Sequence, residues 1–210
     1  MPKIKTITLD PADVDDDGIC ASQTPSGAGA LTLNGALGTT LDYARQIGIY
    51  SASNLSGRTF VVTGTDSHGI TISESITGPN NGTVESSRYF KTISSITISG
   101  AAGGALIVGT VDELVSPIYS MNRQGSIEYG LLATVTGTID YTVQVTGQDI
   151  QSLTDADSLR WLSHDTLVAK TANSTGNIDK AITGMRLKIN SYSSGADVTL
   201  DVVPNNCCSD

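Results

Sequence analysis

Apolar and polar residues alternate at every second position along most of the chain. The alternation is clearest in residues 70–76, 139–145, 185–189 and 198–202. Successive side chains of a β-strand point to opposite faces, so each pattern predicts a strand with one buried face and one wet face. The same criterion predicts further strands over residues 4–9, 47–51, 59–65, 89–98, 105–111, 129–135 and 167–171.

Turn-forming residues separate these segments. They include Asn34-Gly35, Ser56-Gly57, residues 78–82, residues 100–104, residues 175–177 and Ser194-Gly195. Short strands that are punctuated so regularly indicate antiparallel sandwiches or barrels. Helix is scarce, and residues 153–161 are expected to form a turn or two, capped by Thr154 or Asp155. We therefore predict an all-β fold with tandem antiparallel β-sandwich domains of the jelly-roll or Ig-like kind.

The pattern also indicates a domain organisation. Residues 1–45 show only weak alternation and are rich in Gly and other small side chains. They are therefore interpreted as an irregular N-terminal arm packed on the first domain. Residues 46–116 are predicted to form the first β domain and residues 126–210 the second. Residues 117–125 form the predicted linker, because Pro117 lacks a backbone donor for a sheet and favours an extended geometry before it.

Composition supports a folded core and argues against two classes of partner. Hydrophobic residues make up 39% of the 210 residues and charged residues 16%, which is not the balance of a disordered chain. The formal net charge is -9. We expect no nucleic-acid partner, because such binding relies on basic residues that neutralise phosphates. The same charge opposes binding to an anionic membrane.

The three cysteines are Cys20, Cys207 and Cys208. An odd number, with two adjacent residues, does not form a disulfide framework. We expect free thiols and synthesis in a reducing cytosol, and we assign no role to Cys207 and Cys208.

Two histidines raise the question of catalysis. Ser163-His164-Asp165 holds the residue types of a hydrolytic triad, but neighbours in a strand or turn point apart, whereas a triad needs residues that converge. His68 lies in a segment that fits a hairpin turn. With no nucleophile–base pair, phosphate cradle or His-rich cluster, we predict no catalytic residue, no cofactor and no enzyme activity.

Two binding hypotheses follow from other residues. Asp13, Asp15 and Asp17, followed by Gly18, match the start of a calcium loop, but position twelve is Thr24 rather than Glu, so a solvated acidic turn is the favoured interpretation. The aromatic residues are candidates for a sugar-binding cleft, although their period-two spacing is more typical of core or interface: Tyr89, Phe90, Tyr129, Tyr141 and Trp161.

Several segments resemble structural proteins of tailed-bacteriophage virions. In the first half these are residues 63–69 (Thr-Gly-Thr-Asp-Ser-His-Gly), 73–82 and 89–98. The second half is similar through residues 133–144, then Trp161, His164 and Leu167, and then residues 185–190. The resemblance spans most of the chain from Asp10 onward, carries no catalytic signature and does not include the Cys207-Cys208 tail.

The resemblance implies a β-rich virion component made in the host cytoplasm. Together with the polar Ser/Thr faces, it leads us to expect a capsid decoration (cement) protein. Its expected partners are the major capsid protein and copies of itself, in a homotrimer. Two alternatives stay open: a head–tail adaptor or tail protein, and a carbohydrate-binding or host-adhesion module.

Overall fold

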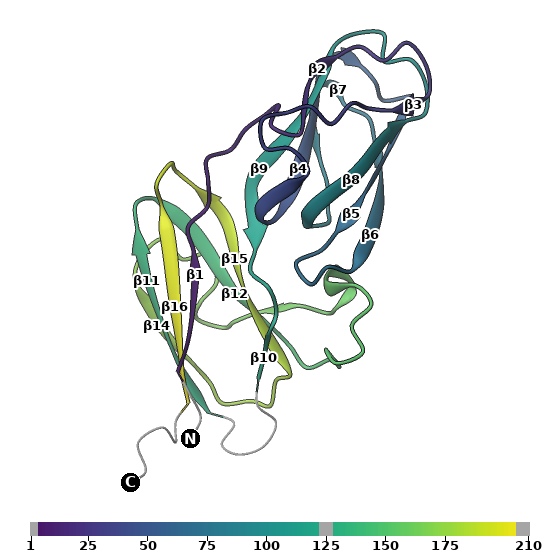
Figure 1. The fold of residues 1–210 in the computed structure, drawn as a ribbon. Helices are drawn as coiled ribbons and strands as arrows, with labels where there is room; N and C mark the ends of the chain where they lie inside the picture. Colours follow the sequence, from purple (N-terminus) through teal and green to yellow (C-terminus); the bar gives the residue numbers. More distant parts are fainter. Residues whose placement is uncertain (1–3, 122–127, 205–210) are drawn as a thin grey trace. The chain divides into compact units, whose positions relative to one another are not determined.

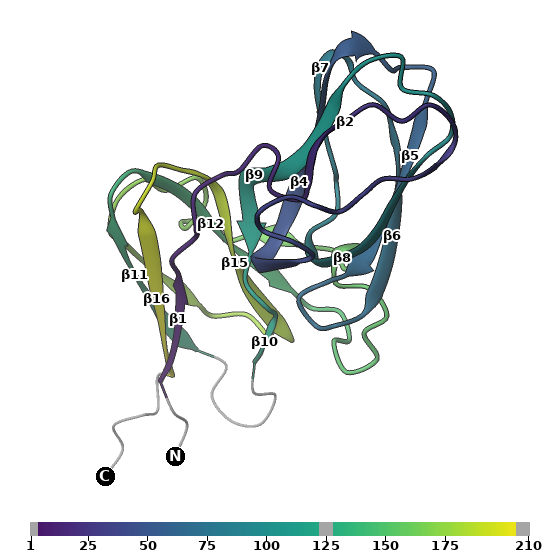
Figure 2. The same ribbon diagram turned by 45° about the horizontal axis from the view of Figure 1, so that its top comes forward.

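A computed structural model describes residues 4–121 and 128–204 of the chain. Strands account for 55% of the residues and helix for 2%, and the sheets are antiparallel, which confirms the predicted all-β fold. The chain divides into two compact units (Figures 1 and 2). We call Val14–Leu114 the insert unit, and Met1–Asp13 together with Val115–Asp210 the terminal unit.

The terminal unit holds two layers of antiparallel strands. One sheet has the order β1 (Lys5–Leu9), β16 (Asp197–Pro204), β11 (Tyr129–Thr136) and β14 (Ser174–Ile178). The other has the order β13 (Leu162–Ser163), β12 (Ile139–Thr146) and β15 (Gly184–Tyr192), with β10 (Tyr119–Ser120) also paired to β15. The alternating apolar residues are the buried ones, among them Ile7, Leu9, Leu131, Tyr141, Val143, Leu187, Ile189, Val198 and Leu200.

The insert unit is built from eight strands. Its main path has the order β9 (Leu106–Val115), β4 (Thr40–Asn54), β8 (Phe90–Ile98), β5 (Thr59–Thr65) and β6 (Thr71–Thr77). Three short strands add to it: β2 (Cys20–Gln23) on β9, β3 (Gly29–Ala30) on β8 and β7 (Asn80–Glu85) on β4. One apolar cluster fills the unit, with Phe60 and Phe90 among many Ile, Leu and Val side chains.

Strand β4 is shared by two sets of neighbours. Its first part pairs with β8, through Thr40 and Arg45, and its second part pairs with β7 from Gly48 to Asn54. Arg45 is only 1% exposed, and its Nε and Nη2 each lie 2.6 Å from a carboxylate oxygen of Asp42. The bidentate pair satisfies a charge that would otherwise be buried alone.

The structure divides the chain at other points than the sequence pattern. Residues 1–45 do not form one arm: β1 pairs with β16 of the terminal unit, whereas Leu31 and Leu41 belong to the core of the insert unit. Within the predicted linker, β10 pairs with β15, and residues 122–125 lie outside the described residues. Long-range pairing of this kind leaves no trace in local periodicity.

Two smaller predictions can also be compared with the structure. The helical turn is the 3-10 helix Ala156–Ser158, and Asp155 caps it by accepting a hydrogen bond from the Asp157 amide. Residues 167–171 do not form the predicted strand. Ala169 has a φ of 48°, a left-handed conformation that interrupts an extended chain, and only an isolated bridge joins Tyr141 to Lys170.

Among the residues that the structure describes, no helix has the length and apolar character needed to cross a membrane.

The close packing of β5 against β8 gives a stability prediction. A Cβ atom at Gly64 would lie 1.9 Å from the backbone oxygen of Thr92. Gly64→Ala should therefore lower the free energy of unfolding by about 1–3 kcal/mol, the usual cost of overpacking. Gly57→Ala is the matched control, since no atom lies within 4 Å of its Cβ position. Urea unfolding measures both, and equal midpoints would contradict the packing.

Burial of Cys20 predicts a pH dependence. Burial raises the pKa of its thiol from 9.0 to about 12. Above pH 9 the unfolded chain loses this proton while the folded chain keeps it, so the thiol's contribution to stability is present below pH 9 and is lost as the pH rises towards 12. Cys20→Ala should remove that part of the alkaline destabilisation, measured by urea unfolding against pH.

The same burial predicts low thiol reactivity. In a Cys207→Ser, Cys208→Ser background, Cys20 should react with a thiol reagent only after denaturant unfolds the protein. Fast labelling under native conditions would show that the site opens.

Candidate functional site

The Ser163-His164-Asp165 segment begins at the last residue of β13 in the terminal unit, and its histidine has a structural role. His164 is 8% exposed, and its Nε2 lies 3.0 Å from the Asn177 carbonyl oxygen. Its Nδ1 accepts hydrogen bonds from the amides of Thr166 at 3.2 Å and Leu167 at 3.3 Å. Both ring nitrogens are therefore used by the backbone. A general base needs a nitrogen that faces the reacting group, and this geometry does not provide one.

A shallow pocket of about 290 Å³ lies beside this segment. At its rim Lys180 Nζ lies 3.4 Å from Asp165 Oδ2, and both side chains are well exposed. An exposed ion pair of this kind contributes little energy. The pocket is lined by the ends of β12, β13 and β14 and the following loop: residues 145–147, 162–165 and 177–182.

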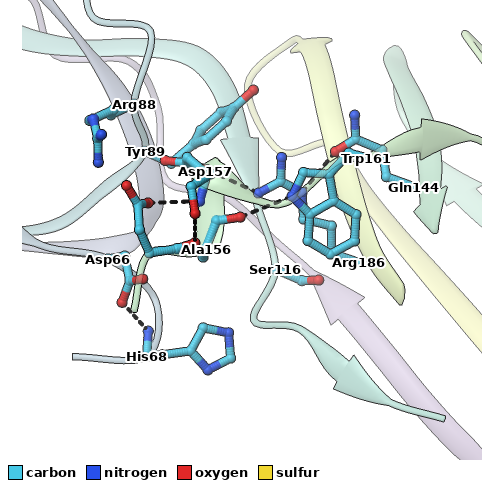
Figure 3. Close-up of polar contacts among 12 residues, drawn as sticks. Asp66, His68, Arg88, Tyr89, Ser116, Gln144, Ala156, Asp157, Trp161 and Arg186 are labelled. Carbon is cyan, nitrogen blue, oxygen red and sulfur yellow. Dashed lines mark hydrogen bonds and ion pairs between the residues drawn. The ribbon is translucent and has the colours of Figure 1, made fainter. Parts of the chain in front are cut away.

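Arg186 organises the long loop between β12 and β13 (Figure 3). Its Nε donates to Gln144 Oε1 at 2.7 Å, and its Nη1 lies 3.1 Å from Asp157 Oδ1. The guanidinium carbon lies 4.3 Å from the centre of the Trp161 ring, and the Trp161 indole donates to the Ala156 carbonyl oxygen. This cation–π and ion-pair cluster fixes the loop and explains the buried charge without a ligand.

Asp13 and Asp15 each accept hydrogen bonds from other groups of the protein. Asp13 accepts a hydrogen bond from Ser194 in the terminal unit. Asp15 caps a turn of the insert unit, since its Oδ1 accepts from the Asp17 amide and its carbonyl oxygen from the Gly18 amide. Across residues 4–121 and 128–204, there is no group of three or more His, Cys, Asp or Glu side chains that could hold a metal ion.

His68 and most of the aromatic candidates are also accounted for. His68 lies in the turn between β5 and β6, where Asp66 Oδ1 accepts from the amides of His68 and Ile70. Phe90 and Tyr141 are fully buried and Tyr89 is 7% exposed. Tyr89 also donates to a Glu113 carboxylate oxygen. Buried rings cannot stack on a sugar, so Tyr89, Phe90 and Tyr141 do not support the carbohydrate hypothesis, whereas Tyr129 and Trp161 are half-buried.

The outward surface of β5, β6 and β8 in the insert unit is the remaining candidate. The outward rows of β5, β6 and β8 carry Ser and Thr at every position except Val61. Cross-strand neighbours follow from the register: Thr65 pairs with Thr71 and Thr92, Thr63 with Ser73 and Ser95, and Val61 with Ser75 and Thr97. We call this surface the hydroxyl face, and define it by Thr59, Val61, Thr63, Thr65, Thr71, Ser73, Ser75, Thr77, Thr92, Ser95 and Thr97.

The hydroxyl face carries no charge on a chain whose net charge is -9. Its members are half-buried or exposed, whereas the alternate residues Phe60, Val62, Ile72 and Ile76 fill the core. Some hydroxyls bond across strands, such as Thr65 with Thr92 at 2.7 Å and Thr63 with Ser73 at 3.3 Å. Polar Ser/Thr faces were visible in the sequence, but which strands combine into one face depends on strand order.

No family model and no curated protein matches the sequence. Structural comparison finds distant neighbours, among them the following three. The major capsid protein P2 of bacteriophage PM2 is 12% identical, with 95% of this chain and 97% of that chain covered and a TM-score of 0.21. The insecticidal delta-endotoxin Cry8Ea1 of Bacillus thuringiensis is 9% identical, with 90% and 60% covered and a TM-score of 0.23.

The third neighbour is the structure of infectious bursal disease virus, Gx strain, at 14% identity, with 99% of this chain and 72% of that chain covered and a TM-score of 0.17. Two of the three neighbours are thus viral, and one of these is a capsid protein. TM-scores this low do not establish a shared fold or a shared function. The functional proposal therefore rests on this chain's own features.

The role of His164 predicts a contrast between neighbouring substitutions. His164→Ala leaves the amides of Thr166 and Leu167 without their acceptor and should cost about 1–3 kcal/mol of unfolding free energy. Asp165→Ala removes only an exposed ion pair and should change stability by less than about 0.5 kcal/mol. Thermal or urea unfolding measures both. Equal effects would contradict the structural role of His164.

Proposed function

We propose that the chain is a non-enzymatic structural component of a tailed-phage virion, and within it a capsid decoration protein on the outer shell. The observation that carries the proposal is the hydroxyl face. A regular, uncharged sheet surface can lie against another protein without desolvating a charge, and desolvation of charge is the main cost of a polar contact. Its many hydroxyl groups can act as donors or acceptors towards a partner.

Two further features support this role. The resemblance to virion structural proteins rests on segments such as residues 63–69, 73–82, 89–98, 133–144 and 185–190. The net charge of -9 suits the outside of a capsid, because the packaged DNA inside would repel an acidic protein. The proposed partners are the major capsid protein and further copies of this chain.

Localisation in the virion tests the proposal. Antibodies raised against the purified chain should label the heads of the encoding phage, and quantitative mass spectrometry of virions should give a copy number comparable to that of the major capsid protein. Tail labelling with a low copy number would favour the adaptor or tail alternative. Absence from the virion would contradict the proposal.

A pair of variants tests the hydroxyl face itself. Thr63→Lys together with Ser95→Lys puts two charges in the centre of the face and should abolish sedimentation with capsids of the encoding phage. The matched control is Thr134→Lys together with Thr175→Lys, two exposed Thr positions in the terminal unit. If both double variants bind capsids like the unchanged chain, the hydroxyl face is not the contact.

A further inference from the structure

Strand β6 is the outermost strand of the main sheet path in the insert unit (Figures 1 and 2). Among the described residues it forms a ladder with β5 alone, in an unbroken register from Thr71 opposite Thr65 to Thr77 opposite Thr59. Proteins protect edge strands with bulges, Pro, Lys or very short lengths. The seven residues of β6, TISESIT, contain no bulge, Pro or Lys, and their one inward-pointing charge, Glu74, is a further kind of edge protection that is bound within its own unit.

Other outer strands of the described chain are protected. β7 contains Asn81 at a φ of 53°, and its pairing with β4 shifts register between Ser51 and Asn54. In the terminal unit, β1 and β14 have five residues each and β13 has two. β6 is therefore the longest regular edge.

The direction of the β6 backbone groups follows from two hydrogen bonds at the ends of the hairpin. The Asp66 amide donates to the Ile70 carbonyl oxygen, and the Gly78 amide donates to the Arg58 carbonyl oxygen. Backbone groups of an antiparallel strand point to alternate sides. The groups of Ile72, Glu74 and Ile76 therefore point towards β5, and those at the odd-numbered positions point outward, away from the sheet: Thr71, Ser73, Ser75 and Thr77.

The sequence of β6 reads the same in both directions. A two-fold axis through Glu74 sets two antiparallel copies so that Thr71 lies opposite Thr77 of the second copy, and Ser73 opposite Ser75. The four outward residues then form four hydrogen-bonded pairs. A two-fold interface requires each surface to complement itself, and a palindromic edge meets this condition over its whole length.

We propose that β6 pairs with β6 of a second copy, so that two insert units share one continuous sheet and one continuous hydroxyl face. The side-chain pairs that result are Ser–Ser and Thr–Thr, the kind that already bond within the chain, as Thr8 does with Thr199 at 3.0 Å. The inference does not depend on the virion role. It replaces the expected homotrimer with a contact between two chains.

Glu74 lies at the centre of the pairing and meets its own copy. Each carboxylate already accepts three hydrogen bonds inside its own unit: Oε1 from the amide and hydroxyl of Ser87, at 2.9 Å and 2.7 Å, and Oε2 from the amide of Arg88 at 3.0 Å. The charge is thus partly compensated within each copy. Glu74→Gln removes the remaining repulsion, but it also replaces one acceptor oxygen by an amino group, so the Ser87 or Arg88 amide loses its partner.

Analytical ultracentrifugation of the full chain tests the pairing. The unchanged protein should form a dimer, and Ser75→Pro should be monomeric, because Pro removes an outward amide that the intrachain sheet does not use. Ser75→Ala keeps that amide and should dimerise like the unchanged protein. Circular dichroism and the unfolding midpoint establish that each variant is folded. An unchanged protein that stays monomeric, or a folded Ser75→Pro variant that dimerises normally, overturns the proposal.

A charge exchange tests the register without touching the backbone. Thr71→Glu together with Thr77→Glu places like charges on both outer pairs, as does Thr71→Lys together with Thr77→Lys. Each double variant alone should dimerise about tenfold more weakly or worse. A mixture of the two should form heterodimers, since each Glu then faces a Lys. If the mixture associates no better than either variant alone, the proposed pairing is wrong.

Discussion

The whole structure depends on burying one row of aliphatic side chains from each strand. The chain has only two Phe and one Trp, so its cores are assembled mainly from Ile, Leu and Val at alternate positions. β-Branched residues suit this task, because they pack well on a pleated surface. The opposite row of each strand is then left facing outward. In β5, β6 and β8 that row is almost entirely Ser and Thr, which produces the hydroxyl face as a direct consequence of the core pattern.

Much of the fold could be predicted because period two is a local signal. The strands at residues 59–65, 70–76, 139–145 and 185–189 were expected from alternation alone, and the structure places strands over nearly the same residues. The predictions that failed, the strand at residues 167–171 and the arm at residues 1–45, depend on features that alternation does not report. Ala169 adopts a left-handed φ within an apolar run, and β1 and Leu31 find their partners far along the chain. Neither a local backbone departure nor a distant pairing changes the hydrophobic pattern.

The candidate site was less predictable for the same reason. Residue types drew attention to Ser163-His164-Asp165 and to the acidic turn, and in the structure His164, Asp13 and Asp15 all hold backbone or neighbouring hydroxyl groups in place. The hydroxyl face consists of residues that are individually unremarkable. It becomes a surface only when β5, β6 and β8 lie side by side in that order. The palindrome of β6 was readable in the sequence, but its meaning depends on β6 being an edge.

Hydrogen exchange followed by mass spectrometry tests most directly whether the β6 edge and the hydroxyl face are the contact surface. The free chain at low concentration is compared with the chain in the assembled particle. The account predicts that peptides covering residues 71–77 become protected on assembly, because the outward amides of Ser73 and Ser75 gain partners. Peptides covering β11 and β14 should exchange alike in both states. Protection confined to β11 and β14, with residues 71–77 unchanged, would contradict it.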